Sequence, residues 1–112
     1  MKTLTDDLIL SVNSPKNRCV GPHAVVYKNE DQPWAIVALD WDNEPRLAIR
    51  WFNSELGNPT SNEYPTWFVI PRELENAILH GLPLKFPVRN EINRFLVKGI
   101  SGNELKQKMS VL

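Results

Sequence analysis

The fold is decided by residues 34–52, which read WAIVALDWDNEPRLAIRWF. Two runs of branched and aromatic residues, 34–41 and 46–52, flank the sequence DNEP, and these residue types favour strands and turns respectively. Residues 24–28, AVVYK, read as an earlier strand that a second turn, EDQP, joins to the first run. We therefore predict three consecutive antiparallel strands connected by two tight turns.

Side chains alternate along a strand, so these turns sort the residues onto two faces. With DNEP as a four-residue turn, Trp41 lies opposite Arg46, and Lys28 lies opposite Ala35 across the other turn. One face is apolar and must be covered by helices; it carries Val25, Tyr27, Trp34, Ile36, Ala38, Leu47, Ile49 and Trp51. The other, which we call the mixed face, carries Val26, Lys28, Ala35, Val37, Leu39, Trp41, Arg46, Ala48, Arg50 and Phe52.

Three interpretations of the mixed face compete. The N-terminal segment partly covers it, with the arginine stems lying over it. It is a subunit interface, since an exposed apolar strip marks a contact surface and most oligomers are symmetric homo-oligomers. It is a shallow site for an anionic or planar ligand, because arginine presents a fixed fork of donors. The candidate contact residues are Lys28, Trp41, Arg46, Arg50 and Phe52.

The segments around the three strands complete an α+β fold. Residues 4–12 fit helix and strand periodicity equally, and the polar residues 53–64 read as a long loop. The sequence TWFVI at 66–70 predicts a fourth strand, apolar on both sides and therefore central.

Three helices are predicted after this strand. Pro71 opens the first and Gly81 ends it. Ser101 and Glu104 form a capping box that begins the third. The residues expected to point inward are Leu74, Ala77 and Ile78 in the first helix, Val88, Ile92, Phe95 and Leu96 in the second, and Leu105, Met109 and Leu112 in the third. We expect one domain over 1–112, with a mainly antiparallel sheet of four or five strands and about three helices, mostly C-terminal, packed on one face.

The composition bounds the class of protein. The formal net charge is zero, which argues against general affinity for nucleic acid. The charge is uneven, because residues 29–75 are acidic and residues 82–112 are basic. This division predicts either attraction within the fold or a basic docking surface. A single cysteine, Cys19, fits the cytoplasm, and no apolar run approaches the ~18 residues of a membrane span.

The motifs for chemistry are incomplete. Cys19 and His23 form at most half of a metal site, and His80 is the only other histidine, whereas a structural zinc site needs four ligands. Asp40 and Asp42 flank Trp41 at the hairpin end, on a turn where aspartate is favoured for local hydrogen bonding. We therefore predict no catalytic residue, no metal and no cofactor.

Residues 88–109 have the spacing of a helix-turn-helix, which makes DNA binding a further alternative. Its candidate contacts are Arg89, Arg94, Lys98 and Lys106. Phe95 stands where close packing of the two helices requires a small residue, and the second helix is short. Nucleic acid is therefore not the expected partner.

The sequence WFVIPREL at 67–74 runs from a predicted strand into a helix opened by a proline. This stretch resembles small orphan proteins that bacterial integrons carry as mobile gene cassettes, and the tryptophan-rich hairpin adds to the resemblance. Such proteins share neither a fold nor a function, so the resemblance transfers no site residue. It implies a bacterial accessory protein, often oligomeric.

The expected function is non-enzymatic binding, with self-association into a homo-oligomer through the mixed face. The first alternative is a small anionic or planar ligand, or an enzymatic accessory role, on the same face. The second is DNA binding through residues 88–109.

Overall fold

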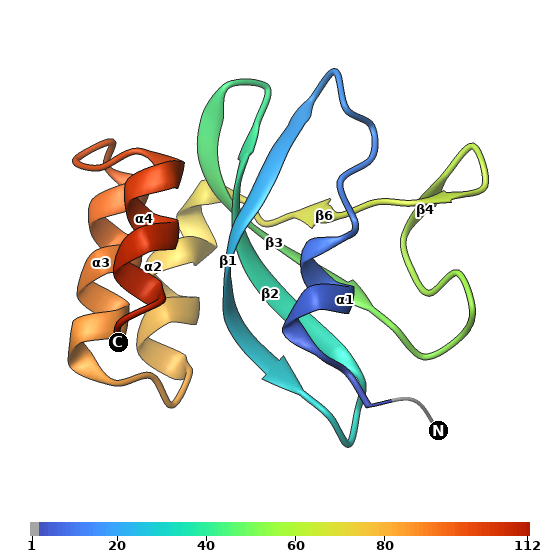
Figure 1. Ribbon diagram of the computed structural model, residues 1–112, viewed down its shortest axis with the longest axis horizontal. Coiled ribbons are helices and arrows are strands. Elements are labelled where there is room, and N and C mark those ends of the chain that lie inside the picture. Colours follow the sequence, from blue (N-terminus) through green and yellow to red (C-terminus); the bar gives the residue numbers. More distant parts are fainter. Residues whose placement is uncertain (1–2) are drawn as a thin grey trace.

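An antiparallel sheet with the strand order β1-β2-β3-β6 forms the centre of the computed structural model, which describes residues 3–112 (Figure 1). The strands of this sheet are β1 (Cys19–Asn29), β2 (Trp34–Trp41), β3 (Glu44–Trp51) and β6 (Phe68–Val69). A small hairpin of β4 (Thr60–Ser61) and β5 (Tyr64–Pro65) lies within the predicted loop. The helices are α1 (Asp6–Leu10), α2 (Arg72–Gly81), α3 (Phe86–Leu96) and α4 (Gly102–Met109). The predicted α+β class is confirmed.

Helices cover the two sides of the sheet unequally. Figure 1 shows α2, α3 and α4 together on one side, with the short α1 on the other. The larger hydrophobic cluster joins the sheet to the three C-terminal helices and includes Ala38, Leu47, Leu79, Ile92, Phe95 and Leu105. The smaller cluster joins the sheet to α1 and includes Leu4, Ile9, Val37, Leu39 and Trp67. Within residues 3–112, none of the helices is long and apolar enough to span a membrane.

The turn between β2 and β3 is tighter than predicted. Trp41 pairs with Glu44 and Leu39 with Arg46, so only Asp42 and Asn43 form the turn. Their φ angles of 53° and 67° are those of a type I′ turn, whose twist matches that of the strands. The register therefore differs from the predicted one by two residues. Because side chains alternate with period two, each residue of β2 and β3 keeps its predicted face.

A bulge in β1 overturns part of the face prediction. Lys28 pairs with Ala35 as expected, but the register shifts between Tyr27 and Val25. Beyond the shift, Val26 belongs to the cluster on the C-terminal helix side, and Val25 packs on the opposite side. The prediction for these two valines was wrong, because an extra residue in one strand reverses the alternation that follows it.

The fourth predicted strand is an edge strand, so its predicted central position was wrong. Only Phe68 and Val69 are in strand conformation, and β6 is last in the sheet order. Trp67 is buried on the α1 side, whereas Phe68 is 60% exposed on the other side. Both side chains are aromatic, so their alternation between burial and exposure is invisible in the sequence.

The inward face of α2 also differs from the prediction. Leu79 and Glu75 are the buried residues of this helix, whereas Leu74 is 51% exposed and Ala77 is exposed. In α4 the predicted capping box is confirmed, with both hydrogen bonds at 3.1 Å. Leu105 is buried as predicted, but Leu112 is exposed.

Candidate protein-binding site

Arg50, a predicted contact residue of the mixed face, lies in the interior with 2% of its surface exposed. Its guanidinium donates hydrogen bonds to the carbonyl oxygens of Leu56, Pro59 (3.4 Å) and Thr66 (2.8 Å). It also lies over the ring of Phe52, 4.9 Å from the ring centroid. Burial lowers the pKa of Arg50 to about 10, so the group remains a cation at neutral pH. Arg50 therefore anchors the segment after β3 and is not available to a partner.

The other predicted contact residues of the mixed face are also engaged within the chain. Lys28 Nζ donates to the Leu4 carbonyl oxygen at 3.1 Å. Arg46 Nη2 donates to the Ile70 carbonyl oxygen at 2.7 Å. The other two residues of the set, Trp41 and Phe52, make ring contacts. Arg18 lies 5.2 Å from the ring of Trp41, and Phe52 packs edge-on against Trp67. The geometry supports the interpretation in which the N-terminal segment and the arginine stems cover this face.

The basic residues considered for DNA binding do not gather on one helix surface. Arg89 donates to the carbonyl oxygens of Leu79 (2.9 Å) and Leu84 (3.1 Å), around the C-terminal end of α2. Two of these basic residues form ion pairs: Arg94 with Glu91 at 2.9 Å, and Lys98 with Glu44 at 3.0 Å. Lys106 lies exposed on α4.

Of the residues considered for chemistry, His23 and Asp40 lie side by side, whereas Asp42 does not join them. His23 Nε2 lies 2.8 Å from Asp40 Oδ2, and the His23 ring packs against Phe95. Asp42 pairs with a different partner, Arg18. Cys19 is buried, and desolvation raises the pKa of its thiol to about 11, so the thiolate is disfavoured. Residues 3–112 contain no cluster of three or more side chains suited to a metal ion.

An open apolar surface lies at the far end of the face that the C-terminal helices cover. A groove of about 340 Å³ lies there between α2 and the strands β2, β3 and β6. None of the side chains that line it carries a charge; they include Trp34, Ile49, Phe68, Leu74, Ile78 and Leu82. We call this hollow the α2 groove.

Aromatic side chains extend the apolar surface beyond the α2 groove. Trp34 contacts Trp51 edge-on with ring centroids 6.4 Å apart, and Trp51 is 40% exposed. A second hollow of about 240 Å³ lies between Phe68, Trp51 and Pro59. The ring of Phe68 therefore stands between two hollows, as a protruding apolar group with space on either side.

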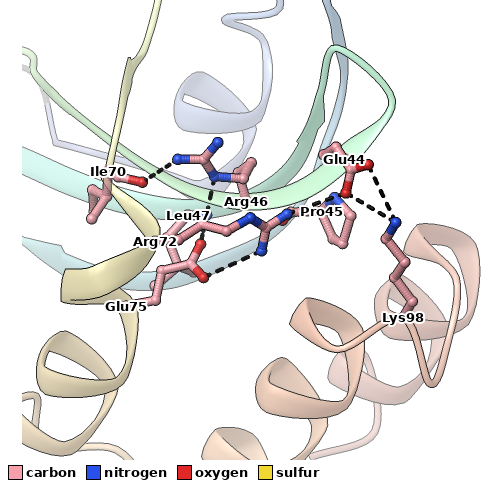
Figure 2. A network of polar contacts seen from close by, with 8 residues as sticks. All are labelled: Glu44, Pro45, Arg46, Leu47, Ile70, Arg72, Glu75 and Lys98. Atoms are coloured by element: carbon pink, nitrogen blue, oxygen red, sulfur yellow. Dashed lines mark hydrogen bonds and ion pairs between the residues drawn. The ribbon is translucent and has the colours of Figure 1, made fainter.

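A polar network fixes α2 against β3 and so forms one wall of the α2 groove (Figure 2). The Glu75 carboxylate, from α2, lies 3.7 Å from Arg46 Nε and 3.6 Å from Arg72 Nη1. It also accepts a hydrogen bond from the Leu47 N–H at 3.4 Å. Because Glu75 turns inward to these donors, its neighbour Leu74 turns outward to the groove.

Figure 2 also shows how the network reaches Lys98, in the turn that follows α3. Glu44 is paired with Arg72 at 3.2 Å and with Lys98, after α3, at 3.0 Å. Hydrogen bonding to Lys98, with the nearby charges of Lys98 and Arg72, lowers the pKa of Glu44, whereas desolvation raises the pKa of Glu75. Ion pairs with two β3 residues, Glu44 and Arg46, thus hold α2, one wall of the α2 groove, against the sheet.

Comparisons of this chain with protein-family models, with curated proteins and with solved structures find no significant match. The α2 groove is therefore argued from its geometry alone. Sequence reasoning missed it because Trp34 and Trp51 were assigned to a fully covered core face. The lengths of the elements carry a signal for the groove. A ten-residue helix such as α2 is about 15 Å long, whereas an eight-residue strand such as β3 spans about 27 Å, so the helix cannot cover the whole strand.

Proposed function

We propose that this protein is a non-enzymatic association module whose binding surface is the α2 groove and whose partner is a second copy of itself. The observation that carries the proposal is the exposed apolar surface of three residues: Phe68 and Leu74 line the uncharged α2 groove, and Trp51 lines the neighbouring hollow beside Phe68. The largest apolar patch on a typical soluble monomer covers about 300–600 Å² and is often functional. As part of the same proposal, we expect a bacterial accessory protein in the cytoplasm.

The size of the patch limits how much of an interface it can supply. A whole aromatic side chain buries about 150–250 Å², so the exposed parts of Trp51 and Phe68 together present on the order of 200 Å². A standard interface takes about 800 Å² from each partner. The exposed parts of these two rings are therefore roughly a quarter of one side of a standard interface, so the dimer also needs the rim around them.

An anionic ligand is less well supported by the geometry. The arginines that would recognise an anion on the mixed face, Arg46 and Arg50, already donate to carbonyl oxygens of this chain. The residues that line the α2 groove offer no cation to an anion. The proposal therefore transfers the predicted self-association from the mixed face to the other face of the sheet.

Sedimentation velocity over a range of protein concentrations tests the proposal. We expect the wild type to shift from monomer to dimer as the concentration rises into the tens of micromolar. Phe68→Glu places a charge in the patch and should remain monomeric with an unchanged melting temperature. The matched control is Val97→Glu, because Val97 is 67% exposed and lies at the end of α3, outside the α2 groove. A wild type that stays monomeric throughout rejects the function.

A further inference from the structure

A third hollow, of about 330 Å³, lies between the start of α3 and the end of α4 and shares no lining residue with the α2 groove. We propose that this hollow, the α3–α4 hollow, binds an acidic segment of another protein. One apolar side chain of the segment sits in the hollow, and the carboxylates on either side of it pair with lysines at the rim. Binding there does not require self-association.

Exposed apolar side chains form the walls of the α3–α4 hollow. Phe86 is 74% exposed, Val111 84% and Leu112 56%, and all three line it. Phe86 stays outside because α3 buries Ile92 and Phe95 in the core. An apolar protein cavity of about 150 Å³ binds benzene, so a hollow of about 330 Å³ has room for one large apolar side chain. A concave surface receives a side chain, whereas a bilayer takes up side chains that project from a protein.

The rim of the α3–α4 hollow carries an excess of positive charge. Glu91 lines the hollow, but its side chain is only 13% exposed and its Oε1 lies 2.9 Å from Arg94 Nη1. Lys108 Nζ is farther away, at 3.8 Å from Glu91 Oε2. Because Arg94 already balances Glu91, the charge of Lys108 is available to a partner, and its ammonium group carries three donors. Lys85, next to Phe86, is exposed as well.

The start of α3 adds to the preference for an acidic partner. Lys85 is the N-cap residue of this helix, and its side chain makes no capping hydrogen bond. The first turn of α3, which the structure describes in full, contains no acidic residue. The N–H groups of a first helical turn lack partners within the helix and carry partial positive charge. A carboxylate of the bound segment is therefore favoured at this end of the hollow, and a basic segment is disfavoured.

The distribution of ion pairs favours a docking surface over attraction within the fold. Among residues 3–112, the ion pair between Lys98 and Glu44 is the one that joins the acidic region 29–75 to the basic region 82–112. The other ion pairs of α3 and α4 lie within the basic region itself. Attraction between the two regions therefore accounts for little of the basic charge of the C-terminal helices.

An array of short synthetic peptides tests the proposal. Each peptide carries one central leucine, phenylalanine, tryptophan or alanine, flanked on both sides by either glutamates or lysines. Wild-type protein is compared with Lys108→Glu, with Phe86→Ser and with the control Lys106→Glu. The control makes the same change of charge on the same helix, and Lys106 does not line the hollow. All four proteins should have similar melting temperatures, because none of the three side chains is buried.

The wild type should bind the glutamate-flanked peptides with a large apolar centre, and neither the lysine-flanked peptides nor those with alanine. Lys108→Glu and Phe86→Ser should each weaken this binding about ten-fold, as for residues at the centre of an interface, whereas Lys106→Glu should change it less than about two-fold. Equal losses at positions 106 and 108, no preference for glutamate flanks, or no binding of any peptide would each show that the proposal is wrong. Vesicles of phosphatidylglycerol provide the last comparison. If the protein binds these vesicles through Phe86 and binds no peptide, the hollow belongs to a lipid surface and the proposal is overturned.

Discussion

On the two faces of the central sheet, the exposure is the reverse of what the composition predicts. The mixed face carries three cations, yet α1 and the segment 52–67 close it, and Arg50 is among the most buried side chains of the protein. The other face is almost entirely apolar, yet one end of it is open at Trp51 and Phe68. A cation in a strand therefore does not establish a solvent face when carbonyl oxygens from a loop satisfy it. An apolar strand does not establish a core when the covering helices do not reach its end.

The largest expected effect concerns the closed face. Arg50→Met should destabilise the protein by about 2–5 kcal/mol, since the buried Thr66 carbonyl and the partly buried Leu56 carbonyl lose this donor at about 1–3 kcal/mol each, whereas Pro59 keeps the Thr66 N–H as a donor. Urea denaturation measures this change. The control is Arg18→Met, whose exposed ion pair with Asp42 contributes about 0–1 kcal/mol. Equal losses in the two variants would mean that Arg50 does not hold the segment.

A pair of leucines on α2 sharpens the comparison on the open face. Leu79 is 1% exposed, so Leu79→Ala should cost about 2–5 kcal/mol of unfolding free energy. Leu74→Ala should cost less than about 0.5 kcal/mol, as for most exposed positions, but it should weaken the dimer. Thermal denaturation and sedimentation velocity together separate stability from association. Similar destabilisation by both substitutions would show that Leu74 is part of the core.

The smallest effect is a dependence on pH at the wall of the groove. Desolvation raises the pKa of Glu75 in the folded protein above its ordinary value of 4.5, so the folded state binds this proton more readily than the unfolded chain. The contribution of Glu75 to stability therefore improves as the pH falls through its folded pKa and is least favourable at neutral pH. Glu75→Gln should flatten the pH dependence of stability just above pH 4.5, as denaturation at several pH values will show.

The opposite sign is expected for the partner carboxylate. Hydrogen bonding to Lys98 and the nearby cations lower the pKa of Glu44, so its contribution to stability is present above pH 4.5 and is lost as the pH falls below that value. The Glu75→Gln variant should still lose the stability contributed by Glu44 as the pH falls below 4.5. If Glu75→Gln also abolishes the pH dependence that is due to Glu44, the two carboxylates act as one group.

The sequence predicted the strands better than their surroundings. Period-two alternation placed the residues of β2 and β3 on the correct faces, and this result survived a turn that is two residues shorter than expected. The capping box at Ser101 was also readable, because its two hydrogen bonds join residues three apart in the sequence. These features depend on local geometry.

What failed depends on contacts between distant segments. Glu75 is buried because Arg46 and the Leu47 N–H meet it from β3, and helical periodicity has no access to that partner. Arg50 is buried because carbonyl oxygens of residues 56–66 converge on it. The α2 groove also results from contacts between distant segments. Because Glu75 points inward, Leu74 points outward, and because β6 is an edge strand, Phe68 is exposed.

Hydroxyl-radical footprinting across a dilution series tests the central claim most directly. The account predicts that Phe68, Trp51 and Leu74 become protected as the protein concentration rises. Phe86, which is 74% exposed at the start of α3, serves as an internal reference and should react equally at every concentration. Protection that is concentration-dependent at Phe86 but constant at Phe68 would contradict the account.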